Sequence, residues 1–173
     1  KDEINAFALP NNHLVVYTGL IADCKNQQAL QGVLGHEIAH IENKHVMKKL
    51  SKEIGFSVLL SATTGGKAGE VLKEIFRTLS SSAYDRSLEK EADITSVDYM
   101  IAADIDPKPL ADFMYEMAMD SQMPKEMYWI ASHPESEERA QYILEYIKGK
   151  KLKSKATITE KEWQAFQKLA EQQ

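Results

Sequence analysis

The stretch that decides the fold is LQGVLGHEIAHI, residues 30–41. Its apolar residues recur at steps of three and four, which is the period of an α-helix. Positions i and i+4 lie on one face of a helix, so His36 and His40 can offer their imidazoles to a single ion. Glu37 is rotated from that face by about 100°, which places its carboxylate near the ion without binding it. The stretch therefore predicts a helix that presents a metal site.

The pattern HExxH is short, and it arises by chance in many helices. Here it lies within an apolar helix. Two histidines and a glutamate facing inward from such a helix would be costly without a shared purpose. This context favours a metal site over an accidental match. Metal analysis of the protein tests the choice, because an accidental match would bind no metal.

A third protein ligand is needed, and one known arrangement fails here. That arrangement places a histidine six residues after the second motif histidine, beyond a glycine that makes a turn. The corresponding positions hold Val46 and Asn43. His45 is one residue out of the required phase, and we interpret it as a surface histidine.

The other common solution takes a glutamate from a separate downstream helix, and the candidate segment is EKEAD, residues 89–93. Glu89 and Asp93 share one face of that helix, whereas Glu91 points to the opposite side. Small Ala92 allows close packing against the motif helix. We therefore predict Glu89 as the third ligand, with Asp93 accepting a hydrogen bond from the far nitrogen of a motif histidine. Glu91 and Asp93 remain the alternative ligands. Without the motif helix, the same acidic segment would be interpreted as a solvent-exposed turn of a helix.

Composition excludes several classes of protein. The chain has 173 residues, 43% hydrophobic and 27% charged, which suits one globular domain with a real core. Its net charge is −5 and no basic stripe with aromatics occurs, so we expect no nucleic-acid partner. Cys24 is the only cysteine, which excludes an intramolecular disulfide and a cysteine-rich zinc site.

The sequence contains no segment that predicts a membrane span or a signal peptide. The longest nearly apolar stretch, residues 54–62, is about half of what a spanning helix needs. However, the chain opens directly on strand-like sequence, so we leave open an upstream signal or lipid anchor as its one contact with a membrane.

The remaining pattern predicts a hairpin followed by helices. Two β-prone runs, residues 4–9 and 13–21, flank Pro10-Asn11-Asn12, whose asparagines tolerate the left-handed conformation of tight turns. Asp106 before Pro107 marks a helix start, because it joins a capping side chain to a residue that needs no amide donor. The helical patterns cover residues 26–50, 56–60, 68–79, 84–103, 107–120 and 135–147, with a glycine pair at 65–66.

The C-terminal part of the chain is predicted to be a linker followed by a short helix that packs on this domain. Residues 148–155 are rich in lysine, which we interpret as a solvated linker. Thr159 and Glu162 form the capping box of a terminal helix. Its apolar stripe predicts packing back on the domain, and the stripe consists of Trp163, Phe166 and Leu169.

We therefore predict a metal-binding domain over residues 1–148 and a basic linker with a short helix over residues 149–173. The predicted fold class is α+β and mainly helical, with a small β-hairpin beside the HExxH helix.

On these residues the chain resembles the gluzincin metallopeptidases of the HtpX, prenyl-protein CAAX protease, Oma, BepA and LoiP type. It looks closest to the soluble LoiP and BepA group, because the membrane-embedded members carry long apolar helices that are missing here. The resemblance covers residues 4–147 and implies a zincin-like metallopeptidase domain. It rests on motifs that occur in the family's order, namely NAFA at 5–8, TGL at 18–20, GHEIAH at 35–40, EKEAD at 89–93 and His133-Pro134 followed by Arg139.

The resemblance implies one zinc ion per chain, bound by His36, His40 and Glu89, with Glu37 as general base. It also implies that the strand at Asn5-Ala6-Phe7 is an edge that pairs with an extended substrate backbone.

The resemblance places His133 and Arg139 across the metal from Glu37. In some relatives this histidine approaches or ligates the zinc and blocks the water site, and in others it stabilises the oxyanion. A histidine and an arginine are sensible donors to a tetrahedral oxyanion. From residue types alone, His133 would be a loop residue at a helix start, and Arg139 would be a surface charge.

The expected function is zinc-dependent hydrolysis of internal peptide bonds. The resemblance implies an unfolded or misassembled polypeptide as substrate, a role in protein quality control, and a location in the bacterial periplasm or attached to the outer membrane. The alternative is a zinc-loaded, chaperone-like or latent binding module in which His133 occupies the water position. Intact Glu37 argues against a dead enzyme, though not against a latent one.

Overall fold

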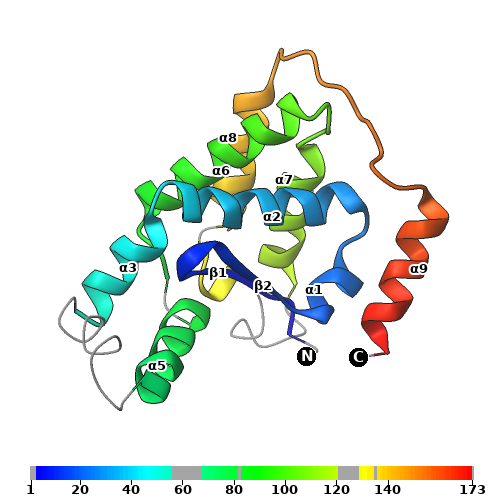
Figure 1. Cartoon of the computed structure of the whole chain (residues 1–173). Coiled ribbons are helices and arrows are strands. Elements are labelled where there is room, and N and C mark those ends of the chain that lie inside the picture. Colours follow the sequence, from blue (N-terminus) through cyan, green and yellow to red (C-terminus); the bar gives the residue numbers. More distant parts are fainter. Residues whose placement is uncertain (1–2, 56–67, 82, 121–128, 135, 173) are drawn as a thin grey trace.

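The computed structural model describes residues 3–55, 68–81, 83–120, 129–134 and 136–172. Within these residues the chain is mainly helical with one two-stranded sheet, which confirms the predicted α+β class (Figure 1). The predicted helix at residues 56–60 and the glycine pair at 65–66 lie outside the described residues. No helix in the described part of the chain is both long and apolar enough to cross a membrane.

The predicted hairpin is present but shorter than expected. Strand β1 (Ala6–Leu9) pairs antiparallel with β2 (His13–Val16), with Ala6 opposite Val16. Asn11 and Asn12 in the intervening turn have φ angles of 61° and 62°, in the left-handed region that asparagine tolerates. The second predicted strand is wrong beyond the hairpin, because residues 18–23 form helix α1 (Thr18–Asp23). Burial of Leu20 in the core outweighs the local preference for strand.

Helix α2 (Gln27–Glu42) carries the motif and begins at Asn26, whose side chain accepts a hydrogen bond from Ala29 N. The prediction of one continuous helix over residues 26–50 is wrong, because the chain forms two helices that are separated near Lys44. Lys44 has a φ of 58°, a left-handed conformation that cannot continue a right-handed helix. A separate helix α3 (His45–Glu53) therefore starts in a new direction.

Two glycines let other helices approach α2 closely. A Cβ atom at Gly35 would lie 2.7 Å from Ser96 Oγ on α6 (Arg86–Ala102). A Cβ atom at Gly32 would lie 2.7 Å from Leu110 Cβ on α7 (Lys108–Met119). Ser96 Oγ also donates a hydrogen bond to Gly32 O at 2.8 Å. Only glycine permits this approach, which brings α6 against the motif helix.

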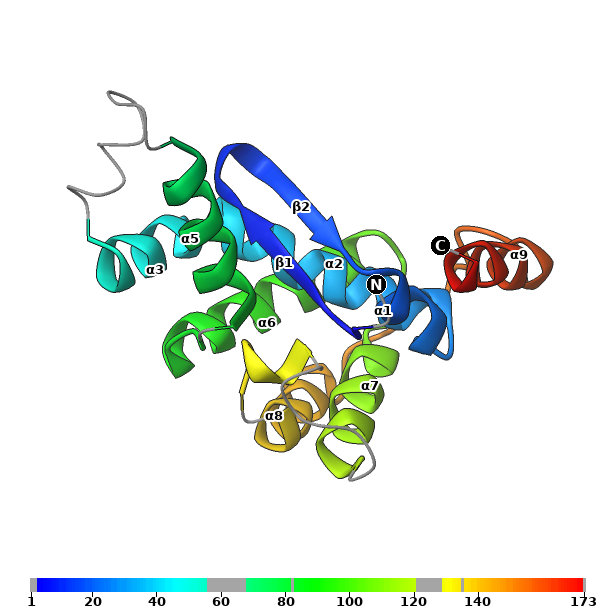
Figure 2. The ribbon, with the colours of Figure 1, turned by 90° about the horizontal axis from the view of Figure 1, so that it is seen from below.

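The hairpin lies below α2, with α5 beside β1 (Figures 1 and 2). One side packs on α2, and helix α5 (Ala68–Ser81) packs against β1 and α3. Phe7 contacts Phe76 of α5, with ring centroids 5.0 Å apart. Phe7 also belongs to a smaller hydrophobic cluster, which consists of Phe7, Ala8, Tyr17, Val46, Leu50 and Leu79. The larger cluster lies around α1, α2, α6, α7 and α8 (Ser136–Ile147).

The terminal helix α9 (Glu160–Glu171) begins with the predicted capping box and packs on α1. Trp163 is 2% exposed, but Phe166 and Leu169 are 42% and 60% exposed, so the predicted burial of the whole stripe is wrong. Gln167 Nε2 donates to three carbonyl oxygens at the end of α1, those of Ile21, Ala22 and Cys24. Helix α9 thus lies beside α1, apart from the layers that carry the motif (Figure 2).

Candidate metal centre

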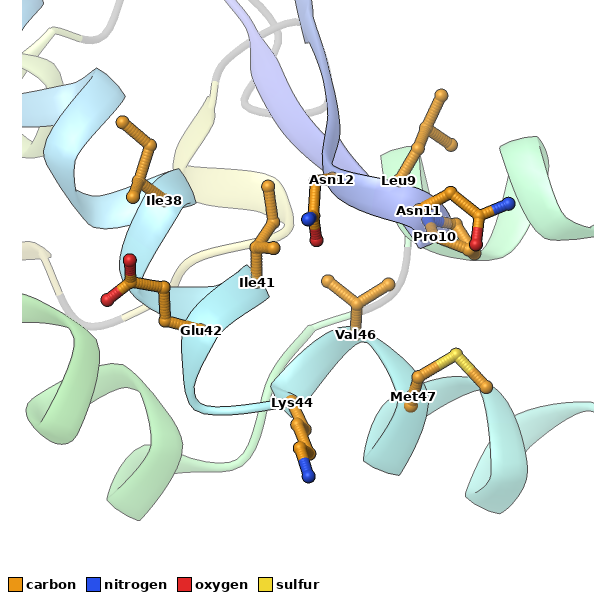
Figure 3. A pocket seen from close by; sticks show the side chains of 10 residues that line it. All are labelled: Leu9, Pro10, Asn11, Asn12, Ile38, Ile41, Glu42, Lys44, Val46 and Met47. Atoms are coloured by element: carbon orange, nitrogen blue, oxygen red, sulfur yellow. The ribbon is translucent and has the colours of Figure 1, made fainter.

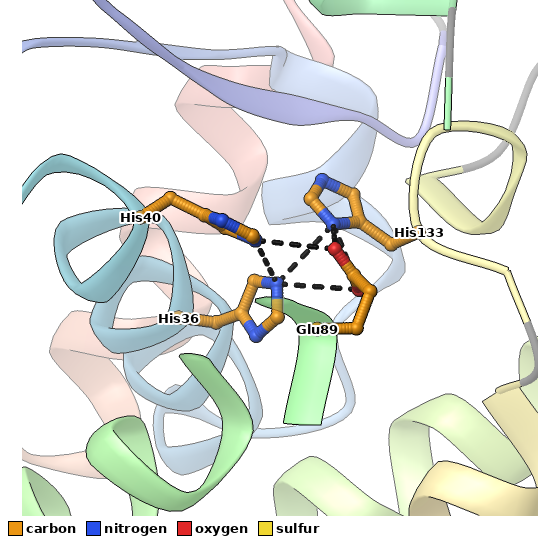
Figure 4. Close-up of side chains that lie close together, drawn as sticks. All are labelled: His36, His40, Glu89 and His133. Atoms are coloured by element: carbon orange, nitrogen blue, oxygen red, sulfur yellow. Dashed lines mark hydrogen bonds and ion pairs between the residues drawn. The ribbon is translucent and has the colours of Figure 1, made fainter. Parts of the chain in front are cut away.

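Four buried side chains from three parts of the chain meet at one point (Figure 4). His36 and His40 come from α2, Glu89 from the first turn of α6, and His133 from the turn after the 3-10 helix η3 (Trp129–Ala131). One ligand atom from each lies within 4.8 Å of all the others. His36 Nε2 is 2.8 Å from His40 Nε2, and these atoms lie 3.6 and 3.2 Å from the Glu89 carboxylate.

His133 is held in the cluster by stacking and by its main chain. Its Nδ1 lies 3.2 Å from His36 Nε2 and 3.0 Å from Glu89 Oε1. The ring stacks on Trp129 with centroids 4.5 Å apart and on Tyr84 at 5.5 Å. His133 N also donates to Trp129 O at 3.1 Å. His133 is therefore a buried member of the cluster, although its residue type alone suggested a loop residue at a helix start.

The spacing of the donors fits a small tetrahedral ion. With metal–ligand bonds of ~2.0–2.1 Å, as for zinc, the ligands of a tetrahedral site lie about 3.3 Å apart. Among His36, His40 and Glu89, the donor separations run from 2.8 Å between His36 and His40 to 3.6 Å between His36 and Glu89, and all four donor atoms lie within 4.8 Å of one another. The donor set of imidazoles and one carboxylate also suits zinc.

Electrostatics favours the metal-binding protonation states of His40 and Glu89, but not that of His133. Although burial would lower it, Glu89 and Glu37 raise the pKa of His133, which favours its protonated form. Burial, together with the neighbouring His36, lowers the pKa of His40 to about 3, so its imidazole is neutral. Burial alone would raise the pKa of Glu89, but His133 and Arg139 lower it well below its usual range. Neutral histidine and ionised glutamate are the forms that bind metal ions.

Asp93 and Arg139 form a buried layer behind the donors. Asp93 Oδ1 lies 2.8 Å from His36 Nδ1, the nitrogen that faces away from the cluster. Arg139 donates to both Asp93 oxygens, at 2.7 and 2.8 Å, and Tyr142 OH donates to the same carboxylate. Although burial would raise it, Arg139 above all holds the pKa of Asp93 below its usual range.

Arg139 is not the surface charge that its residue type suggests, because it is only 2% exposed. Its Nη1 lies 2.6 Å from Glu89 Oε2 and donates to the main-chain oxygen of His133 at 3.0 Å. The guanidinium thus contacts Asp93, Glu89 and His133 at once. In this arrangement it holds ligands, and an oxyanion role for Arg139 remains a prediction from the family resemblance.

Glu37 lies beside the cluster without belonging to it. Its Oε2 accepts a hydrogen bond from Ala8 N of β1 at 3.0 Å, and its Oε1 accepts one from Trp129 Nε1 at 2.8 Å. His133 Nε2 is 3.2 Å from Glu37 Oε1, but the two are not aligned as a hydrogen bond. Burial would raise the pKa of Glu37, but the neighbouring histidines, led by His133, lower it to about 2. Glu37 is therefore an ionised carboxylate, as a general base must be.

The direction of the β1 main chain shows which groups face its outer edge. Tyr17 N donates to Asn5 O at 2.9 Å, so Asn5 and, by antiparallel alternation, Phe7 direct their main-chain groups toward β2. Ala6 and Ala8 face the opposite edge. Of the predicted substrate-pairing residues Asn5, Ala6 and Phe7, only Ala6 thus has main-chain groups on that edge. Trp129 N donates there to Ile4 O at 2.6 Å.

Sequence reasoning missed three aromatic residues of the site. The prediction that His45 lies at the surface is wrong, because its side chain is fully buried and its Nδ1 is 3.1 Å from His40 Nδ1. The left-handed turn at Lys44 places it there, and lysine gives no sign of such a turn. Tyr84 stacks on His40 with centroids 4.0 Å apart, and Trp129 bonds Glu37. Their only sequence signal was proximity to the motif segments at 89–93 and 133.

A separate groove lies at the hairpin turn (Figure 3). It has a volume of about 600 Å³ and lies between residues 9–12 and the junction of α2 with α3. Its lining is largely apolar and includes Leu9, Pro10, Ile38, Ile41, Val46 and Met47. The Asn12 side chain points toward Ile41 and Val46. None of the clustered donors lines it, so it is distinct from the candidate metal centre.

Comparison with known proteins gives consistent matches. The profile of Peptidase family M48 matches residues 1–147. Mitochondrial metalloendopeptidase OMA1 of Schizosaccharomyces pombe is 29% identical over 146 residues, 83% of this chain and 43% of that protein. Metalloprotease LoiP of Escherichia coli is 31% identical over 82% of this chain and 58% of its own length. Metalloprotease YcaL of the same organism is 31% identical over 84% of this chain and 59% of its own length. The chain thus spans roughly half the length of these relatives.

Proposed function

This chain belongs to peptidase family M48, and we propose that it binds one zinc ion and hydrolyses internal peptide bonds. The observation that carries the proposal is the combination of two features in one buried site. Donor atoms of His36, His40 and Glu89 converge within 4.8 Å of one another and of His133, and an ionised carboxylate, Glu37, lies beside them without being one of them. Such a division between ligands and base is what metal-assisted hydrolysis requires.

The roles of the residues follow from their places. Zinc bound to the donors would polarise the scissile carbonyl and acidify a water molecule. Glu37 accepts the proton from that water and passes it to the leaving amine. An extended substrate backbone pairs with the outward main-chain groups of Ala6. Arg139 positions Glu89 and Asp93, and His133 donates to the oxyanion once it leaves the donor cluster.

A specific observation favours a latent form as the second candidate. Catalytic zinc sites keep one position for water or substrate. Here His133 Nδ1 lies within 3.2 Å of both His36 Nε2 and a Glu89 oxygen, and the donors are almost fully buried. The alternative function is therefore a zinc-loaded, self-inhibited module that binds polypeptides in a chaperone-like manner until the turn carrying His133 moves.

We also propose an unfolded or misassembled polypeptide as substrate. Pairing with a strand edge needs an extended segment, which a folded protein seldom exposes. On the resemblance to LoiP and BepA, the proposed setting is quality control in the bacterial periplasm or at the outer membrane. Cell fractionation of the full-length protein tests this location, and recovery in the cytoplasm would contradict it.

One assay separates the peptidase from the latent module. Degradation of an unfolded casein is compared for the zinc-loaded wild type, Glu37→Gln, His133→Ala and the control Glu53→Gln, an exposed glutamate on α3. Activity that is lost only in Glu37→Gln and reduced in His133→Ala supports the peptidase. Activity that appears only in His133→Ala supports self-inhibition. Casein binding without cleavage in every form would overturn the peptidase in favour of the chaperone-like module.

Metal analysis tests the ligand set directly. The wild type is expected to contain one zinc per chain, and Glu89→Ala to lose it. Full zinc occupancy in Glu89→Ala would refute Glu89 as a ligand and turn attention to Glu91 or Asp93.

A further inference from the structure

The second motif histidine has an outer partner of an unusual kind. His40 directs Nε2 into the donor cluster, and its Nδ1 lies 3.1 Å from Nδ1 of the buried His45. The other nitrogen of His45, Nε2, lies 3.2 Å from Glu91 Oε2. A chain of two hydrogen bonds therefore runs from the candidate metal ligand to Glu91, whose side chain is 54% exposed.

Only one placement of protons satisfies this chain with neutral rings. A histidine that binds metal through Nε2 carries its proton on Nδ1, so His40 must donate to His45. His45 Nδ1 is then the acceptor, and its own proton must be on Nε2, where it is donated to the Glu91 carboxylate. Each ring fixes the tautomer of the next, and the Glu91 carboxylate is the last acceptor in this chain of hydrogen bonds.

The first motif histidine is held differently. His36 Nδ1 lies 2.8 Å from Asp93 Oδ1, and Asp93 is itself gripped by Arg139. His40 has no carboxylate at its Nδ1 in the described part of the chain, because His45 stands between it and Glu91. The outer partner of His36 is thus a buried carboxylate, whereas that of His40 is a second imidazole that leads to a half-exposed carboxylate.

We propose that His45 is a positioning residue that fixes the tautomer and ring orientation of His40, with Glu91 as the terminal acceptor. The proposal rests on the proposed zinc site. The left-handed turn at Lys44 brings the first residue of α3 back against His40, so the backbone break serves this contact. Losing the outer partner of a metal-binding histidine weakens metal affinity by roughly 10- to 100-fold.

The competing explanation is that His45 merely fills space between α3 and α6. Space filling predicts that any apolar side chain of similar size preserves metal affinity. Val46 is the matched control, because it is a buried neighbour on the same helix that makes no polar contact with the cluster.

The experiment measures the zinc dissociation constant of the full chain by competition with a chromophoric chelator, together with the Tm of the zinc-free protein. His45→Leu is expected to raise Kd by 10- to 100-fold. His45→Asn keeps an acceptor near the Nδ1 position and is expected to retain most of the affinity. Glu91→Ala is expected to raise Kd a few-fold, and Val46→Ala to lower Tm while leaving Kd unchanged.

A wild-type Kd in His45→Leu would overturn the proposal, as would an equal weakening by Val46→Ala. Nitrogen-15 spectra of the wild-type imidazoles supply a readout that needs no variant. The zinc-loaded protein should show His45 with its proton on Nε2, and a proton on Nδ1 would refute the chain of donors. A wild type that binds no zinc would overturn the zinc site itself and this inference with it. A wild type that binds zinc, together with an unchanged Kd in His45→Leu, would overturn this inference alone and leave the zinc site standing.

Discussion

The guanidinium of Arg139 holds both carboxylate oxygens of Asp93, at 2.7 and 2.8 Å, and Asp93 reaches His36 Nδ1 at 2.8 Å. Both partners are buried, so removing the cation leaves Asp93 and Glu89 charged and poorly solvated. We expect Arg139→Leu to lower the free energy of unfolding by about 3–5 kcal/mol, measured by urea denaturation of the metal-free protein. The control Lys108→Leu removes an exposed pair with Asp112 and should change stability little. Equal effects in both variants would contradict this.

Gly35→Ala should push α6 away from α2. Its new Cβ atom would lie 2.7 Å from Ser96 Oγ, and we expect a loss of about 1–3 kcal/mol in unfolding free energy together with weaker zinc binding. The double variant with Ser96→Ala should recover zinc affinity, because the next contact, with Ser96 Cβ, is an ordinary 3.6 Å. Gly69→Ala on α5 meets nothing within 4 Å and should stabilise the protein slightly. A failure of Ser96→Ala to rescue would show that the clash is not the cause.

Lys49 should make the free energy of unfolding depend on pH in the alkaline range. Burial lowers its pKa from 10.5 to about 8, against the opposing attraction of Glu89, Glu37 and Glu53, and its Nζ lies 3.9 Å from the centre of the Tyr84 ring. Between these two pKa values Lys49 holds a proton in the unfolded chain that it has released in the folded chain, so Lys49 contributes a rise of the unfolding free energy with pH. In Lys49→Met that rise should disappear, and stability at pH 7 should increase by on the order of 1–2 kcal/mol. Urea denaturation from pH 7 to 10.5 provides the measurement, and an unchanged slope in the variant would refute the assignment.

Trp163 should anchor α9 to the domain without influencing the metal. It is 2% exposed, and Trp163→Ala is expected to cost about 3–5 kcal/mol of unfolding free energy. Phe166→Ala on the same helix is the control, because this ring is 42% exposed and should contribute much less. Zinc affinity should be unchanged in both variants, since α9 packs on α1 and not on the donors. Weaker zinc binding in Trp163→Ala would contradict that separation.

The parts of the site that the sequence predicts are those that a regular helix determines. The spacing of His36 and His40, and of Glu89 and Asp93, needs only the helical period and no knowledge of the tertiary fold. His45 could not be placed, because a single left-handed residue, Lys44, changes the direction of the chain just before it.

Residue types and spacing alone could not place Trp129, nor could they place Arg139 without the family resemblance. Arg139 meets Asp93 across 46 positions of sequence, and Trp129 meets Glu37 across 92. Such contacts depend on how α6, α8 and η3 pack, which local pattern does not determine. The same limit applies to α1, where a β-prone run became helix because the core required Leu20.

Trp129 contacts a residue just before strand β1, the proposed base and the histidine that competes with water. Its main chain bonds Ile4, its indole N–H bonds Glu37, and its ring stacks on His133. Indole emission shifts to the red when the ring passes from a buried site into water. Because Trp129 and Trp163 are the two tryptophans of the chain, a Trp163→Phe background makes Trp129 the only source of this signal. The molecule thus contains its own optical reporter, which would show in real time whether the donor His133 leaves the cluster before a substrate arrives or only afterwards.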